Sequence, residues 1–152
     1  MDNTLNELKN TNRMKDEEIY AGFSPKEIKS MRAEVTQRWG ADELKATEDR
    51  IQVMGKDGWN NAKQKGEEVN QLLADLMDLP VESINVQRAI ELHFRHLNLF
   101  YEVSKERYLG LAQMYVEDER FKAHYDKYRA GLAVFIKAGI TVFCENGLRV
   151  KT

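Results

Sequence analysis

The chain has 152 residues, which suits one domain with a hydrophobic core of its own. Its formal net charge of -2 provides no concentrated basic surface and argues against direct nucleic-acid binding by this chain. The single cysteine, Cys144, excludes an internal disulfide and fits a reducing compartment. There is no apolar run long enough to cross a bilayer and no signal-peptide pattern, so we expect a cytoplasmic protein without membrane contact.

The apolar residues recur at helical intervals and not in strand-like alternation, which predicts an all-α fold. Residues 1–18 carry few apolar side chains, and we expect a polar N-terminal arm or linker remnant there. The first firm helix is predicted to begin at Ser24, where Pro25 suits the first helical position. It is predicted to end at Gly40.

Two further helices are predicted in the N-terminal half. A short one occupies residues 42–54 and is stopped by Gly55, and a long one occupies about residues 58–79. Gly66 lies inside the long helix at a cost of about 1 kcal/mol relative to alanine, which favours a bend or close packing there. Pro80 then breaks the chain.

The C-terminal half begins with a helix that Ser83 is predicted to cap and whose apolar side extends to Tyr101. A helix over about residues 104–117 follows, either separate from it or continuous with it. Asp118 is predicted to cap a short helix, and the last helix is predicted over about residues 130–145.

No motif for catalysis stands out, so we expect neither an enzyme nor a cofactor. His93 and His96 lie one helical turn apart, and with His124 they leave a haem or metal site open as a rival hypothesis. No accompanying HExxH or cysteine pattern supports such a site, and structural histidines are favoured. Cys144 is interpreted as a buried small side chain in preference to a reactive thiol.

The aromatic side chains gather in the C-terminal half, where the spacing alone fits either a core or the wall of an apolar ligand cleft. The same half carries a distinctive run between Tyr101 and Tyr125, and a Gly-Leu-Ala triplet begins at Gly131. The run contains, in order, Gly110, Leu111, Met114, Tyr115, Val116, Asp118, Glu119, Arg120 and Phe121. This pattern resembles the TipAS antibiotic-recognition domain, the drug-sensing C-terminal module of some MerR-type transcription activators. The resemblance covers about residues 19–147 and includes Arg38-Trp39-Gly40.

The resemblance implies a globin-like helical domain with a deep ligand cleft over residues 19–152. Residues 19–79 would form lid helices and residues 80–147 the cleft-forming helices. The implied function is binding of bulky, largely apolar small-molecule or peptide antibiotics. The chain would act either as the effector-sensing domain of an activator or as a stand-alone, drug-sequestering form. DNA contact would then be made only by an upstream winged helix-turn-helix. The alternative is a protein-interaction module whose apolar groove holds a partner helix.

The expected ligand-binding residues are aromatic side chains and one histidine, and no metal ligand is expected among them. They are Trp39, Trp59, His93, Phe100, Tyr101, Tyr108 and Tyr115. Some members of the family carry cysteines that trap their ligands covalently, and Val103 and Gly110 occupy the corresponding positions here. Covalent capture through those positions is therefore excluded in this chain.

Overall fold

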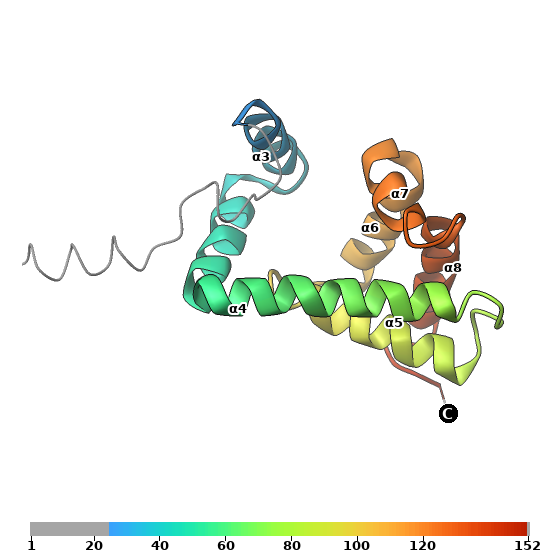
Figure 1. Cartoon of the computed structure of the whole chain (residues 1–152). Coiled ribbons are helices and arrows are strands. Elements are labelled where there is room, and N and C mark those ends of the chain that lie inside the picture. The colour runs from blue at the N-terminus through green and yellow to red at the C-terminus, as the bar shows by residue number, and fades with distance from the viewer. Residues whose placement is uncertain (1–24, 152) are drawn as a thin grey trace, which may run out of the picture. The chain divides into compact units, whose positions relative to one another are not determined.

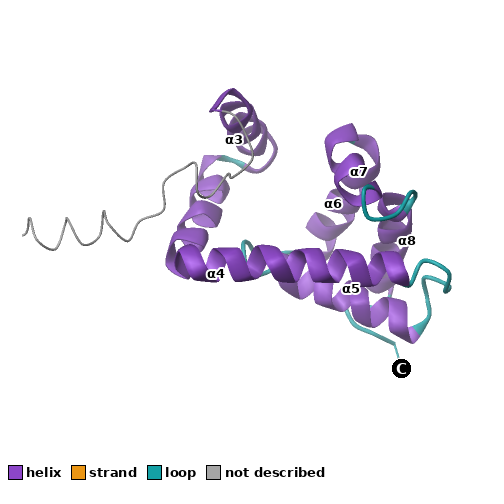
Figure 2. Ribbon diagram, in the orientation of Figure 1, coloured by secondary structure: helices purple, strands orange, loops and turns teal. Residues whose placement is uncertain are grey.

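The computed structural model describes residues 25–151 and shows an all-α fold there (Figure 1). The expected arm at residues 1–18 and the Ser24 cap lie outside the described residues. Helices and connecting loops make up the described part of the chain, which contains no strand (Figure 2). The helices are α3 (Pro25–Trp39), α4 (Ala41–Asp75), α5 (Ile84–Leu97), α6 (Lys105–Glu117), α7 (Glu119–Asp126) and α8 (Leu132–Glu145). None of them is both long enough and apolar enough to cross a membrane.

The described residues form two compact units, which divide between residues 63 and 64. In the first unit, Gly40 separates α3 from α4 with a φ of 96°, as the sequence predicts for a helix stop. At Gly55 the backbone has φ 74° and ψ 176°, which are not helical values, so α4 is kinked there. The predicted helix stop at Gly55 is confirmed as a break in the helical backbone, and the residues on either side of it form two helices that meet at this kink.

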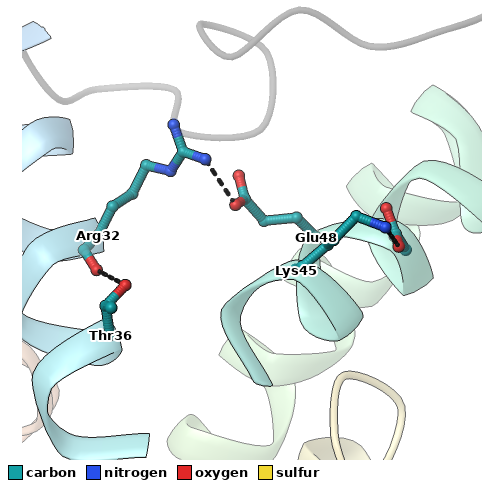
Figure 3. A network of polar contacts seen from close by, with 5 residues as sticks. Arg32, Thr36, Lys45 and Glu48 are labelled. Atoms are coloured by element: carbon teal, nitrogen blue, oxygen red, sulfur yellow. Dashed lines mark hydrogen bonds and ion pairs between the residues drawn. The ribbon is translucent and has the colours of Figure 1, made fainter. Parts of the chain in front are cut away.

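An ion pair links α3 to the first part of α4, and further polar contacts lie within each helix (Figure 3). An Arg32 guanidinium nitrogen lies 3.1 Å from a Glu48 carboxylate oxygen, and the Thr36 hydroxyl donates to the Arg32 carbonyl at 2.8 Å. Lys45 and Asp49 form an i,i+4 pair at 3.5 Å. Exposed pairs of this kind contribute only about 0–1 kcal/mol each, so they are a minor part of what holds these helices.

In the second unit, α8 packs against α5, α6 and α7. Its sequence is apolar almost throughout, and seven of its residues are buried. These are Leu132, Ala133, Ile136, Gly139, Ile140, Phe143 and Cys144. A helix that is apolar on most of its surface is stable only when other elements surround it, which explains the place of α8 in this unit.

A close approach of α5 and α8 depends on Gly139. A β-carbon at Gly139 would lie 2.9 Å from Cδ1 of the fully buried Ile90. Because the two helices lie this close, the Gln87 side chain reaches the Gly139 backbone: its Nε2 donates to the Gly139 carbonyl at 3.1 Å and to the Val81 carbonyl at 2.7 Å. The glycine thus permits both the packing contact and a buried hydrogen bond between the two helices.

The helix boundaries in this unit correct several predictions. α4 ends at Asp75 and not near Leu79, and α8 begins at Leu132, after Gly131 in the left-handed region at φ 89°. α5 ends at Leu97, so Tyr101 lies beyond it in a connecting segment, and α6 is a separate helix. The predicted cap at Asp118 is confirmed, because its carboxylate accepts a hydrogen bond from the Arg120 amide.

Replacement of Ser104 by alanine is expected to lower the free energy of unfolding by about 1 kcal/mol. The Ser104 hydroxyl accepts a hydrogen bond from the Arg107 amide at 3.1 Å and caps α6. Urea denaturation measures the effect. Ser83→Ala is the matched control, because Ser83 occupies the N-cap position of α5 without a side-chain cap bond. An equal loss in both variants would contradict this explanation.

Candidate ligand-binding site

A histidine lies at the centre of the aromatic core of the second unit. His93 on α5 is only 3% exposed. Its Nδ1 lies 2.7 Å from the Tyr108 hydroxyl on α6, and its Nε2 lies 3.1 Å from the Tyr125 hydroxyl on α7. One imidazole therefore connects three helices through hydrogen bonds.

The hydrogen bonds around His93 have a definite direction. The Tyr108 hydroxyl donates to the Ile90 carbonyl at 3.4 Å, and a carbonyl can only accept. His93 Nδ1 must therefore donate to the Tyr108 oxygen, which leaves Nε2 to accept from the Tyr125 hydroxyl. The Tyr125 oxygen accepts in turn from Tyr115. The chain of donors runs from Tyr115 through Tyr125 and His93 to Tyr108.

Burial keeps this chain of hydrogen bonds uncharged. It lowers the pKa of His93 to about 3, and the nearby charge of His96 acts in the same direction. Burial also raises the pKa values of Tyr108 and Tyr115 well above the usual value. Every member is neutral near pH 7, which is the form that a low-dielectric interior favours.

Ring contacts hold the same side chains together. The Tyr115 ring stands edge-on to His93 with centroids 6.0 Å apart, and its centroid lies 4.7 Å from that of Tyr125. On the other side, Phe94 lies 5.1 Å from Tyr108 between ring centroids. Three of the expected site residues, His93, Tyr108 and Tyr115, thus form one cluster.

Tyr101 and Phe100 lie in the segment that connects α5 to α6. The Arg107 guanidinium lies 4.2 Å from the centroid of the Tyr101 ring. Burial raises the pKa of Tyr101 to about 12, against the opposing effect of the Arg107 charge. Phe100 packs edge-on against His96 at 5.2 Å.

The two expected tryptophans belong to the first unit. Trp39 is the last residue of α3, and Trp59 lies on α4, where the Lys63 ammonium is 5.2 Å from its ring centroid. Both side chains are partly buried. A shared site between them and the cluster around His93 stays a prediction.

His93 and Cys144 are buried side chains with hydrogen-bond partners. Both ring nitrogens of His93 are engaged by tyrosine hydroxyls, and residues 25–151 contain no cluster of three or more metal-ligating side chains. Cys144 is buried, as predicted, and its thiol lies 3.9 Å from the Lys105 carbonyl. Burial raises the pKa of Cys144, which keeps the thiol protonated and unreactive.

Comparison with known protein families identifies the family of this helical domain. The family model described as the TipAS antibiotic-recognition domain matches residues 31–143. The chain belongs to the TipAS family. The matched segment contains every expected site residue and all of the cluster around His93, so the aromatic core described above is part of a TipAS domain.

Several curated relatives of this TipAS domain are HTH-type transcription regulators. The activator mta of Bacillus subtilis is 24% identical over 96% of this chain and 59% of its own length. TipA of Streptomyces coelicolor is 28% identical over 81% of this chain and 49% of its own length. SkgA of Caulobacter vibrioides is 22% identical over 96% of this chain and 60% of its own length. The chain thus spans about half to three-fifths of the relatives it matches.

A solved structure shares the fold of this TipAS domain. It is TipAS of Streptomyces lividans in complex with nosiheptide, described within a thiopeptide antibiotic multidrug resistance system. The match has a TM-score of 0.71 and 26% identity, and it covers 88% of this chain and 94% of that chain. The predicted all-helical TipAS fold is thereby confirmed.

Two residues that sequence reasoning left out of the site lie in direct contact with it. Tyr125 bonds His93 Nε2, and its helical position after the Asp118 cap was the available signal. Arg107 lies over the Tyr101 ring. No sequence signal pointed to Arg107, because the contact depends on how the segment between α5 and α6 turns.

Proposed function

We propose that this chain binds bulky, largely apolar antibiotics. It serves as the effector-sensing domain of a MerR-type transcription activator or as a stand-alone, drug-sequestering form. The observation that carries the proposal is the structural similarity to TipAS in complex with nosiheptide. The aromatic cluster supports it, because ligand sites combine large apolar surfaces with a few polar groups. A tyrosine side chain supplies both, because its ring is a large apolar surface and its hydroxyl is a polar group.

Binding, and not catalysis, is the role that the electrostatics of the cluster favour. A general acid or base works best when its pKa lies near the working pH. The pKa of His93 is lowered to about 3, and burial raises the pKa of Tyr108 well above its usual value. Neither side chain exchanges a proton readily near pH 7, which supports a non-enzymatic function.

In the activator form, DNA contact belongs to an upstream winged helix-turn-helix, and the protein acts in the cytoplasm. The relatives' description as HTH-type regulators supports this division of roles. We propose that residues 19–79 close as a lid over ligand held by residues 80–147. Ligand binding and DNA binding are then linked, since a ligand that orders the domain changes the free energy of the DNA-bound state, and the reverse holds equally.

The test is a thermal-shift titration of the purified chain with nosiheptide. A ligand at a hundredfold excess over its dissociation constant stabilises the folded state by about 2.7 kcal/mol, which corresponds to a rise of roughly 5–10 °C in Tm. Both tryptophans lie in the first unit, so their fluorescence reports on the proposed lid alone. We expect a saturable rise in Tm with a change in tryptophan emission at the same ligand concentrations.

Two tyrosine variants make this test specific. Tyr101→Ala is expected to weaken nosiheptide binding. Tyr128→Ala is the matched control, because this partly buried tyrosine packs against Lys127 at the end of α7. No rise in Tm with nosiheptide or other bulky amphiphilic antibiotics would overturn the proposal. Equal affinity of the two variants would remove Tyr101 from the site.

A further inference from the structure

One tyrosine of the candidate site is partly exposed to solvent. Of the tyrosine cluster (Tyr101, Tyr108, Tyr115 and Tyr125), the last three are 0%, 3% and 6% exposed, whereas Tyr101 is partly exposed. The charge that Tyr101 would carry on ionisation raises the pKa values of the other three, which supports its assignment to the same cluster. Of these four tyrosines, Tyr101 therefore offers the most surface to a ligand that approaches from solvent.

Tyr101 lies between two helices, where no helical turn continues on its C-terminal side. The Asn98 side chain bridges the two ends of this segment. Asn98 donates from its amide to the Phe94 carbonyl at 2.8 Å and accepts from the Val103 amide at 3.1 Å. These bonds fix the backbone of residues 98–103, but they do not orient the Tyr101 ring.

The contact with Arg107 orients this ring. Arg107 lies in the first turn of α6, where its backbone amide donates to the Ser104 hydroxyl. From there its side chain extends back, and Nη1 donates to the Glu102 carbonyl at 3.1 Å. The guanidinium lies 4.2 Å from the Tyr101 ring centroid, within the range of a cation–π contact. Hydrogen bonds thus hold both the backbone and the guanidinium of Arg107, and the guanidinium covers one face of the Tyr101 ring.

We propose that Arg107 is a positioning residue of the ligand site, and that it holds the Tyr101 ring in the orientation that ligand contacts. This inference rests on the proposed function. A ring that is already oriented loses less rotational freedom on binding, and this freedom is a main cost of association. Loss of the guanidinium is therefore expected to weaken ligand binding roughly threefold to tenfold.

Isothermal titration with nosiheptide measures the affinity of wild type and variants. Arg107→Met retains an unbranched apolar side chain and removes the guanidinium, whereas Arg107→Lys retains the charge and a possible contact with the ring. We expect the largest loss of affinity in Arg107→Met and an intermediate loss in Arg107→Lys. Arg95→Met is the matched control, because Arg95 is an exposed α5 residue paired with Glu91 at 3.3 Å.

A second measurement needs no ligand. In protein labelled with 3-fluorotyrosine, the ¹⁹F resonance of Tyr101 is assigned by its loss in Tyr101→Phe. Arg107→Met is expected to shift or broaden that resonance while the resonances of the buried tyrosines stay in place. A variant that was merely less stable would not change one tyrosine alone.

The outcomes separate this inference from the proposed function. Binding by wild type that is weakened in Arg107→Met, with a displaced Tyr101 resonance, would support both. Equal affinity of Arg107→Met and wild type would overturn the inference, whatever the resonance does, and would leave the proposed function standing. No binding by wild type would overturn the proposed function and the inference that rests on it.

Discussion

Replacement of His93 by leucine is expected to lower the free energy of unfolding by roughly 2–4 kcal/mol. Leucine has a similar volume, so the loss comes mainly from two buried hydrogen bonds: the Tyr125 hydroxyl loses its acceptor, and the Tyr108 oxygen loses a donor although its hydroxyl still donates to the Ile90 carbonyl. A buried polar group without a partner costs about 1–3 kcal/mol. Guanidinium denaturation at neutral pH, followed by circular dichroism, measures the difference from wild type.

Two further variants show whether the hydroxyls account for this loss. Addition of Tyr115→Phe and Tyr125→Phe to His93→Leu removes the hydroxyl that has lost its acceptor together with the hydroxyl that donates to it, while Tyr108 still donates to the Ile90 carbonyl. Much of the stability is then expected to return. His124→Leu is the matched control, since His124 is exposed and a surface substitution of this kind changes stability by about 0.5 kcal/mol at most. A triple variant as unstable as His93→Leu would mean that packing, and not hydrogen bonding, sets the effect.

The helices of this domain could be predicted from sequence because their signals are local. Asp118 lies directly before Glu119, and its carboxylate caps α7 as the sequence indicates. Gly40 has the positive φ that a helix stop requires. In each case the deciding interaction connects residues within a few positions of each other, so the pattern along the chain is sufficient.

The arrangement of the site could not be predicted in the same way. The His93–Tyr125 hydrogen bond joins residues 32 positions apart, and spacing along one helix carries no information about it. Tyr101 continues the apolar periodicity of α5, but the helix ends at Leu97 because the Asn98 side chain bonds the Phe94 carbonyl and the Val103 amide. Side-chain competition of this kind for backbone groups overrides periodicity. As a result, Tyr101 lies in the connecting segment and not on a face of α5, and Arg107 covers its ring.

The stability of the domain is expected to fall in mild acid because of His93. Its pKa is lowered from 6.5 to about 3 by burial, with the charge of His96 as a second cause. Between these two values the unfolded chain binds one more proton than the folded chain, so falling pH favours unfolding. The stabilisation that comes from the neutral, buried His93 is fully present above about pH 6.5 and is lost progressively as the pH falls below this value. From about pH 7 to about pH 5 the expected loss is about 2 kcal/mol.

Comparison with His93→Gln isolates this contribution. Glutamine retains one donor and one acceptor but does not titrate, and the carboxylates and the other two histidines are common to both proteins. Urea denaturation at a series of pH values is expected to show a stability loss in wild type that exceeds that in His93→Gln by about 2 kcal/mol at about pH 5. Parallel pH profiles would contradict a neutral, buried His93. They would show instead that the imidazole takes up a proton in the folded protein, which requires the donor chain from Tyr115 to Tyr108 to reverse or break.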